Sequence, residues 1–325
     1  MVILRGRGTL IALLIYGVRV ERDIHGYMNV NHFAVVPMLA VCCLLSGFGI
    51  SAQAPAGSPR PEVGADAGSI KETKDIRQLQ SDEFLVDTAY LQDEDEFLHK
   101  LTYQRGNDGE WSADFTEEVT LGSQKHQFVL SIPAHIAGND IDISKGVGDA
   151  HLEYSFGLYG DSSSRVTVSP GVGLSIPTGS VRKGLGAGGP GLSLKIPVGV
   201  LLGGRFASNS IFEMEYTRSA RNIEGEHANS INYQVGQSFV WFAKPRLNLF
   251  IESVWERSKE IIGVGRTRNQ YSLLVSPAVR WAYELKSGLS ISPGIAVPIG
   301  IGPSRGTRDI VFYIAFGHPA RRGQD

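Results

Sequence analysis

Apolar residues recur at every second position in segment after segment between about residue 96 and residue 317. One such segment has Thr, Ser or Gly between the apolar positions Val166, Val168, Val172, Leu174 and Ile176. A period of two is that of a β-strand with one apolar and one polar face, whereas an amphipathic helix repeats every ~3.6 residues. The sequence therefore predicts an all-β fold for this region.

Turn-forming residues divide the region into strands. Runs such as Gly106-Asn107-Asp108-Gly109 and Lys286-Ser287-Gly288 are typical of turns between antiparallel neighbours. About twelve strands are expected, beginning near residues 96, 111, 125, 148, 165, 191, 210, 230, 246, 270, 287 and 307. Short links such as Ala207–Asn209 alternate with longer ones, which are expected at Thr178–Gly189 and Arg257–Arg268.

Strand length and link length favour a membrane barrel. A membrane-spanning β-strand needs ~9 to 11 residues, and bacterial barrels have an even number of strands, with short turns at one end and longer loops at the other. Alternation alone is equally compatible with a soluble barrel. Aromatic residues at apolar strand ends favour the membrane, because they form interfacial girdles there: Trp241, Trp255, Tyr271, Trp281 and Tyr283. We expect an antiparallel transmembrane β-barrel.

The N-terminal part of the chain predicts export. Residues 33–50 form an uncharged apolar run, and Ala52 and Ala54 give the small-x-small pattern of a signal-peptide cleavage site. A membrane anchor is the alternative, although Pro37 and two glycines interrupt the run. The predicted organisation has five parts: an upstream segment at 1–27 with Met28 as an alternative start, a signal peptide at 28–54, a flexible linker at 55–95, the outer-membrane barrel at 96–317 and a C-terminal tail at 318–325.

Charge and cysteine content exclude several classes of protein. A formal net charge of −2 gives no basic footprint for nucleic acid. The two cysteines, Cys42 and Cys43, both lie inside the expected signal peptide, so the mature chain has neither a disulfide framework nor a thiolate metal site. The histidines are scattered without metal-ligand spacing. We therefore expect no metal and no cofactor, and we expect outer-membrane lipid, the barrel assembly machinery and a small-molecule solute as partners.

Several motifs resemble those of a known family. The chain carries Gly146-Val147-Gly148-Asp149 before one strand, and Pro177-Thr178-Gly179 after the next. With the segment LLVSPAVRW at Leu273–Trp281, these motifs make residues 98–316 similar to the MetA-pathway of phenol degradation family. The resemblance implies a twelve-stranded outer-membrane barrel that passes small molecules, aromatic or apolar compounds among them, and it implies no catalytic residues. Phe316 would be the terminal aromatic residue of the last strand, but nine residues, Gly317–Asp325, follow it.

Residues on the polar faces of the strands are the candidate site. If the apolar faces contact lipid, the opposite faces line the lumen. The candidate lumen-lining residues are Lys195, Glu213, Glu215, Phe242, Phe250, Glu252, Glu256, Arg280, His151 and Glu153. Their charges are mixed in sign, which indicates weak ion selectivity or ion pairs that brace the wall. The two phenylalanines would narrow the passage or contact an apolar solute.

Three functional hypotheses remain. The first is an outer-membrane channel or facilitated transporter for small molecules, which is not an enzyme. The second is a hydrolase on the barrel, because His151, Glu153 and Ser155 share the polar face of one strand. The third is a structural barrel or a secreted β-barrel binding protein without transport.

Overall fold

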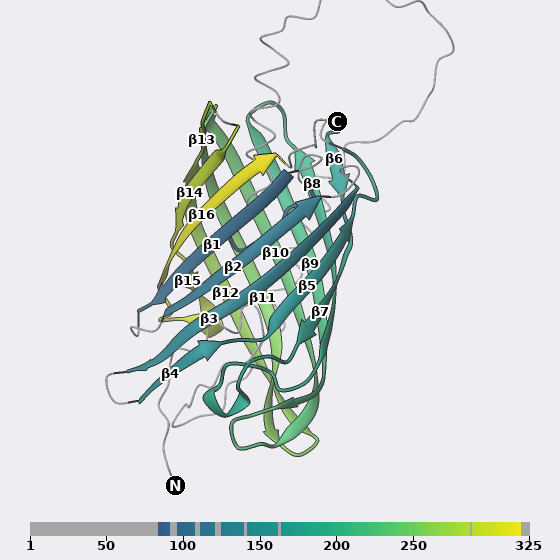
Figure 1. Ribbon diagram of the computed structural model, residues 1–325, viewed down its shortest axis with the longest axis vertical. Helices are drawn as coiled ribbons and strands as arrows, with labels where there is room; N and C mark the ends of the chain where they lie inside the picture. The colour runs from purple at the N-terminus through teal and green to yellow at the C-terminus, as the bar shows by residue number, and fades with distance from the viewer. Residues whose placement is uncertain are drawn as a thin grey trace, which may run out of the picture. The chain divides into compact units, whose positions relative to one another are not determined.

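A computed structural model describes residues 84–91, 96–107, 111–120, 125–139, 142–161, 164–286 and 288–319. Among these, twelve strands form a closed antiparallel ring (Figure 1). The ring strands are, in order, β1 (Glu96–Gly106), β2 (Trp111–Thr120), β3 (His126–Asn139), β5 (Ala150–Phe156), β7 (Gly171–Ile176), β8 (Gly191–Leu201), β9 (Phe206–Arg221), β10 (His227–Lys244), β11 (Leu247–Gly263), β12 (Arg266–Trp281), β14 (Ser290–Ala296) and β16 (Asp309–Pro319). The predicted fold class is therefore confirmed.

Four short strands continue ring strands beyond local breaks: β4 (Asp142–Val147), β6 (Val166–Val168), β13 (Tyr283–Glu284) and β15 (Ile299–Gly300). β4 and β5 pair with successive parts of β3, and β14 and β15 with successive parts of β12. Pro170 and Pro298 lie in two of the breaks, where a residue without an N–H cannot continue the ladder. Two short 3-10 helices lie in loops, η1 (Val181–Lys183) and η2 (Gly302–Ser304).

The first and last strands close the ring. β1 pairs with β16 from Glu96 opposite Pro319 to Gly106 opposite Asp309. The last strand thus continues past Phe316 and through the first two residues of the expected tail. Residues 1–83, with the expected upstream segment and signal peptide, and residues 320–325 lie outside the described part.

One expected loop is a strand pair instead. Residues 257–263 belong to β11 and 266–268 to β12, and the two strands pair continuously from Leu247 opposite Trp281 to Ile261 opposite Thr267. The turn between them contains Gly265 at φ 68, a conformation that glycine adopts readily. The charged residues of this stretch are typical of a loop, but here they continue the strand pairing of β11 and β12 beyond the apolar part of the hairpin.

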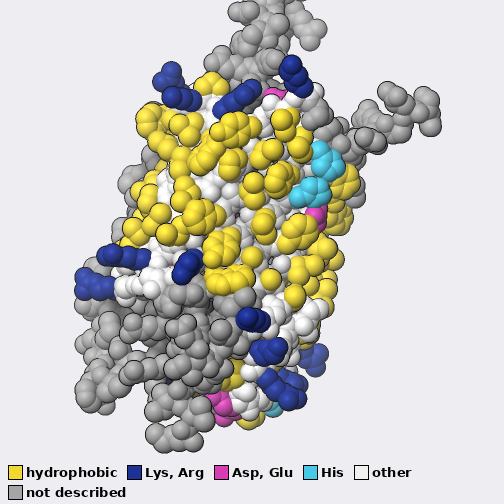
Figure 2. All heavy atoms as spheres, turned by 60° about the vertical axis from the view of Figure 1, so that its left-hand side comes forward, with side chains coloured by type: hydrophobic (Ala, Val, Ile, Leu, Met, Phe, Trp, Pro, Cys, Tyr) yellow, Lys and Arg dark blue, Asp and Glu magenta, His cyan; other side chains and the backbone are white. Residues whose placement is uncertain are grey.

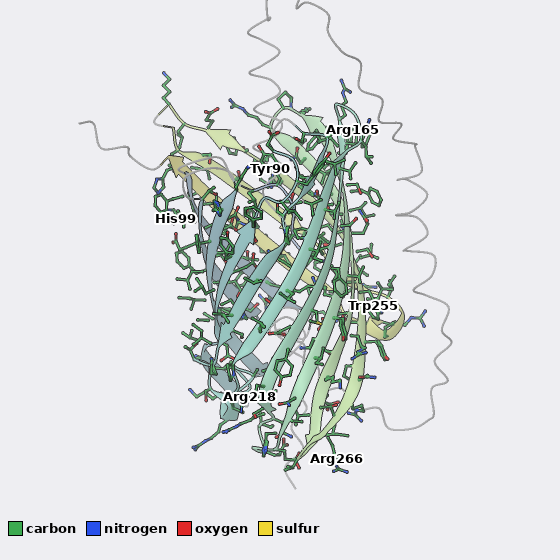
Figure 3. The ribbon with its side chains drawn as sticks, turned by 90° about the vertical axis from the view of Figure 1, so that its right-hand side faces the viewer. Tyr90, His99, Arg165, Arg218, Trp255 and Arg266 are labelled. Carbon is green, nitrogen blue, oxygen red and sulfur yellow. The ribbon has the colours of Figure 1, made fainter. Side chains whose placement is uncertain are left out.

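The outer face of the barrel is apolar. On β8, Leu192, Leu194 and Ile196 are 48%, 43% and 50% exposed, whereas the side chain of Lys195 is only 14% exposed. Hydrophobic side chains cover much of the visible outer surface in Figure 2, and Trp255 lies on the outer wall in Figure 3. An apolar exterior around a polar interior is the pattern of a membrane barrel. Within the described part, no helix is long and apolar enough to cross a membrane.

The two ends of the barrel differ. β1 begins and β16 ends at one end, the terminal end, where Pro245 and Arg246 alone separate β10 from β11. The opposite end, the far end, carries the longest connection, at 177–190, and a second one at 301–308, each with a 3-10 helix. Figure 3 shows Arg165 near the terminal end and Arg266 at the far end.

Candidate functional site

Residues Phe84–Leu91, here called the inner segment, lie inside the barrel. Their side chains and backbone contact strands on several sides of the ring, including β8, β10, β11, β14 and β16. Val86 and Ala89 are each 1% exposed. The composition of residues 55–95 predicts a flexible linker; within this stretch the structure holds residues 84–91 against the inner wall, because apolar side chains gain by packing there.

A buried carboxylate anchors the inner segment. Glu252 on β11 is 1% exposed, and its Oε2 accepts a hydrogen bond from the Leu85 backbone N–H at 3.1 Å. The backbone amides of Phe84 and Val86 also hydrogen-bond this carboxylate. Successive amides that converge on an anion form a backbone nest, which offsets part of the cost of burying the carboxylate.

Aromatic contacts hold Phe84, the first residue of the inner segment. The ring of Phe84 lies 5.5 Å from that of Phe250, edge-on, and 5.6 Å from that of Tyr313. Gly294 leaves room for the Phe84 ring, since a Cβ added there would lie 2.6 Å from Phe84 Cζ. Arg280 lies over the Phe250 ring, with its guanidinium carbon 5.6 Å from the ring centroid. Phe84 therefore occupies an aromatic recess in the wall.

A charged cluster holds the next part of the inner segment. Lys195 Nζ lies 2.6 Å from Asp87 Oδ2 and 2.6 Å from Glu153 Oε1. Glu213 is directly opposite Lys195 in the β8–β9 register. Beyond this cluster, Ser169 Oγ donates a hydrogen bond to the Ala89 carbonyl at 2.6 Å. One lysine thus forms ion pairs with a carboxylate of the wall and a carboxylate of the inner segment and links the two.

The ten candidate residues occupy the face opposite the exposed apolar residues, and they fall into groups. Glu153, Lys195 and Glu213 belong to the charged cluster, and Phe242, Phe250 and Arg280 lie near the aromatic recess. Glu252 binds the inner segment, Glu215 accepts a hydrogen bond from Asn232, and Glu256 accepts one from Ser272. His151 lies opposite Ser131 and Ser175.

Ser155 and Glu153, two residues of the hydrolase hypothesis, are bonded to each other and lie beside Lys195. Ser155 Oγ donates a hydrogen bond to Glu153 Oε1 at 2.9 Å, and the same oxygen is ion-paired with Lys195. A carboxylate engaged by a lysine is a poor base for a serine hydroxyl, because the positive charge stabilises its deprotonated form. This geometry favours a structural role for Ser155. Within the described residues, no group of three or more His, Cys, Asp or Glu is placed to hold a metal ion.

The two glycine-containing motifs meet at the far end. Asp149 Oδ1 accepts a hydrogen bond from the Gly179 N–H and Oδ2 one from the Ala187 N–H, each at 2.7 Å. Thr178 Oγ1 donates to the Gly148 carbonyl at 2.8 Å. A Cβ on Gly186 would lie 2.4 Å from Asp149 Oδ1, so only glycine fits there. The motifs therefore clamp the 177–190 loop to the wall.

Sequence reasoning missed the inner segment and the clamp. The one available signal for the inner segment was Phe84-Leu85-Val86, an apolar triplet in an otherwise polar stretch. For the clamp, the signal was the co-occurrence of Gly146-Val147-Gly148-Asp149 and Pro177-Thr178-Gly179, the two motifs that carry the family resemblance. Neither signal reveals which wall residues are the partners, because those partners come from strands far away in the chain.

Comparisons with known proteins were made in sequence and in structure. No protein-family model matches the chain, and no curated protein matches it in sequence. An outer-membrane channel from Pseudomonas putida F1 is similar in structure, with a TM-score of 0.55 and 12% identity over 71% of this chain and 97% of that chain. The NanC porin gives a TM-score of 0.45 at 6% identity (68% and 98% covered), and the CymD monoaromatic hydrocarbon channel 0.42 at 7% (71% and 90% covered). The fold is that of an outer-membrane β-barrel.

Proposed function

We propose that this protein is an outer-membrane channel in which the inner segment controls the passage of small molecules. The observation that carries the proposal is the seating of Phe84–Leu91 across the interior of the barrel. A solute that crosses the barrel must pass this segment or displace it. The ten candidate residues line the proposed path, and insertion by the barrel assembly machinery is part of the proposal.

The aromatic recess supports a preference for aromatic or apolar solutes. Phe84 occupies a space bounded by the rings of Phe250 and Tyr313 and by Gly294. When the inner segment leaves, a space that accepts a phenyl ring becomes available to another ring of similar size. The motif likeness supports the further proposal that the chain is a distant member of the MetA-pathway of phenol degradation family.

A disulfide lock tests the control step. The Ala89 Cβ lies 3.7 Å from the position of a Cβ added to Gly199, and the hydroxyl of Thr167, 2.7 Å from the same position, must rotate away to admit it. Disulfides have a Cβ–Cβ separation of about 3.8 Å, so the double variant Ala89→Cys/Gly199→Cys is expected to cross-link the inner segment to β8. Liposome swelling with small neutral solutes, measured before and after reduction, reports the permeability of the locked and released forms.

We expect low permeability in the oxidised double variant and full recovery on reduction, while each single-cysteine variant resembles the parent chain. Equal swelling in the oxidised and reduced forms would mean that solutes bypass the inner segment. No swelling by a properly folded parent chain, with any small solute, would contradict the channel itself. A broad esterase assay on the same samples tests the hydrolase alternative.

A further inference from the structure

Three polar side chains meet on the outer surface, where the first and last strands join. His99 lies on β1, His318 on β16 and Glu117 on β2, and His99 is directly opposite Glu117 in the register. His99 Nε2 lies 3.0 Å from His318 Nε2, and His99 Nδ1 lies 2.5 Å from Glu117 Oε2. Figure 2 shows adjacent histidine side chains and an acidic one within the apolar surface, and Figure 3 shows His99 projecting from the outer wall.

Neighbouring rings hold this group in place. The His318 ring stacks on that of Phe97, with centroids 5.7 Å apart and planes at 24°. On its other side it faces the His99 ring at 5.1 Å and 32°. Phe97 is also the residue paired with His318 across the β1–β16 ladder. The two imidazoles are therefore positioned by packing and by backbone pairing, which lowers the entropy cost of binding a ligand between them.

The two Nε2 atoms, which are hydrogen-bonded to each other, are the candidate ligands. A carboxylate can only accept, so the Nδ1 of His99 carries the proton that is shared with Glu117. A neutral His99 then accepts, through the lone pair of its Nε2, a hydrogen bond from the Nε2–H of His318, and a metal ion that binds both nitrogens takes the place of this proton, which is released. Histidines that bind metals commonly donate their other ring N–H to a carboxylate, which orients the ring and raises its basicity. Glu117 stands in that relation to His99.

We propose that His99 and His318 form a binding site for a divalent transition-metal ion such as zinc. Nitrogens at 2.0–2.1 Å from one ion lie about 2.9 Å apart at a right angle and about 3.3 Å apart at the tetrahedral angle. The observed 3.0 Å between the two Nε2 atoms falls within this range. A small rotation of the rings points both lone pairs at the ion, and water fills the remaining positions. Glu117 contacts the imidazole rather than the ion.

An ion bound at this position affects the stability of the closed barrel. β1 and β16 are the two strands whose pairing closes the ring. An ion held by one histidine from each strand links them at the terminal end, and a ligand that binds only the closed form stabilises that form. Zinc should therefore make the barrel harder to unfold.

The test uses the full exported chain, purified without a polyhistidine tag and stripped with a chelator. Zinc is titrated by calorimetry, and the midpoint of heat-induced unfolding is followed by gel mobility. We expect one zinc ion per chain and a higher midpoint in zinc. His99→Ala and His318→Ala should abolish both effects, and Glu117→Gln should weaken binding about 10- to 100-fold. His126→Ala is the matched control, because His126 is bonded to the Tyr154 hydroxyl, 2.8 Å away, and should change neither readout.

A spectroscopic measurement on the unmutated chain keeps the proposal testable if a variant fails to fold. With one equivalent of copper(II), the electron paramagnetic resonance spectrum should show coupling to two equatorial nitrogens. A spectrum without nitrogen coupling, an unchanged unfolding midpoint in zinc, or full zinc binding by a folded His99→Ala chain would each overturn the proposal and leave a simple imidazole–imidazole hydrogen bond.

Discussion

Replacing Phe84 with alanine tests whether the inner segment is held by the contacts described here. The substitution removes the ring from its recess beside Phe250 and Tyr313, while the amide of Leu85 and its carboxylate partner are left intact. The wall of the barrel keeps all its strand pairs. The variant should therefore loosen the inner segment without changing the stability of the barrel itself.

The expected magnitude follows from the environment of the ring. Truncation of a buried Phe to Ala costs about 3–5 kcal/mol. Phe84 is only half-buried, so we take the lower value of about 3 kcal/mol. Since each ~1.4 kcal/mol is a factor of ten in an equilibrium constant, the ratio of docked to undocked inner segment should fall about 100-fold.

Hydrogen exchange measures this ratio. Exchange of the Leu85 amide requires release of its hydrogen bond to Glu252, so its rate should rise by the same factor of about 100, up to the rate of an exposed amide. Phe115→Ala is the matched control, because Phe115 is 45% exposed on the outer wall. An unchanged Leu85 rate would refute the docking argument. An equal rise in the amides of β11 would show general destabilisation instead.

Three further predictions concern the wall and the loops. Ile196→Lys should destabilise the folded barrel by about 2–4 kcal/mol in urea titrations, whereas Ser193→Lys, on the inner face of the same strand, should cost much less. Asp149→Asn weakens two charge-assisted hydrogen bonds, about 1.5–3 kcal/mol each, so trypsin should cut the 177–190 loop faster than in the parent chain. Lys195→Met leaves its two carboxylate partners without their cation, and the reversal potential in a KCl gradient should shift toward cation selectivity.

The barrel could be predicted because its signal is local and repeated. Each strand carries its own alternation, and an error in one strand does not affect the next. The parity of Lys195 and Ile196, for example, follows from their neighbours within a few residues, and the structure places them on opposite faces. Twelve strands were expected and twelve form the ring among the described residues.

The rest depends on contacts that local patterns do not encode. The expected loop at 257–268 is a hairpin because β11 and β12 continue beyond their apolar part, where polar side chains give no lipid-facing signal. The last strand reaches Pro319 because β1 begins far enough back to pair with it. The partners of Phe84 and Asp87 lie more than a hundred residues away in the chain, and only closure of the ring brings them within reach.

The inner segment contributes charged and hydrogen-bonding groups to the interior of the barrel as well as apolar side chains. Asp87 supplies one of the two carboxylates at Lys195, and the backbone amides of Phe84–Val86 supply hydrogen bonds to Glu252. Removal of the segment therefore leaves Glu252 as a carboxylate without those donors, beside the exposed ring of Phe250. By contrast, Glu215 keeps a partner from the wall, Asn232, in either state. A passing solute thus meets groups that are buried in the occluded form. A substitution of Glu252 should therefore change selectivity, whereas one of Glu215 should not.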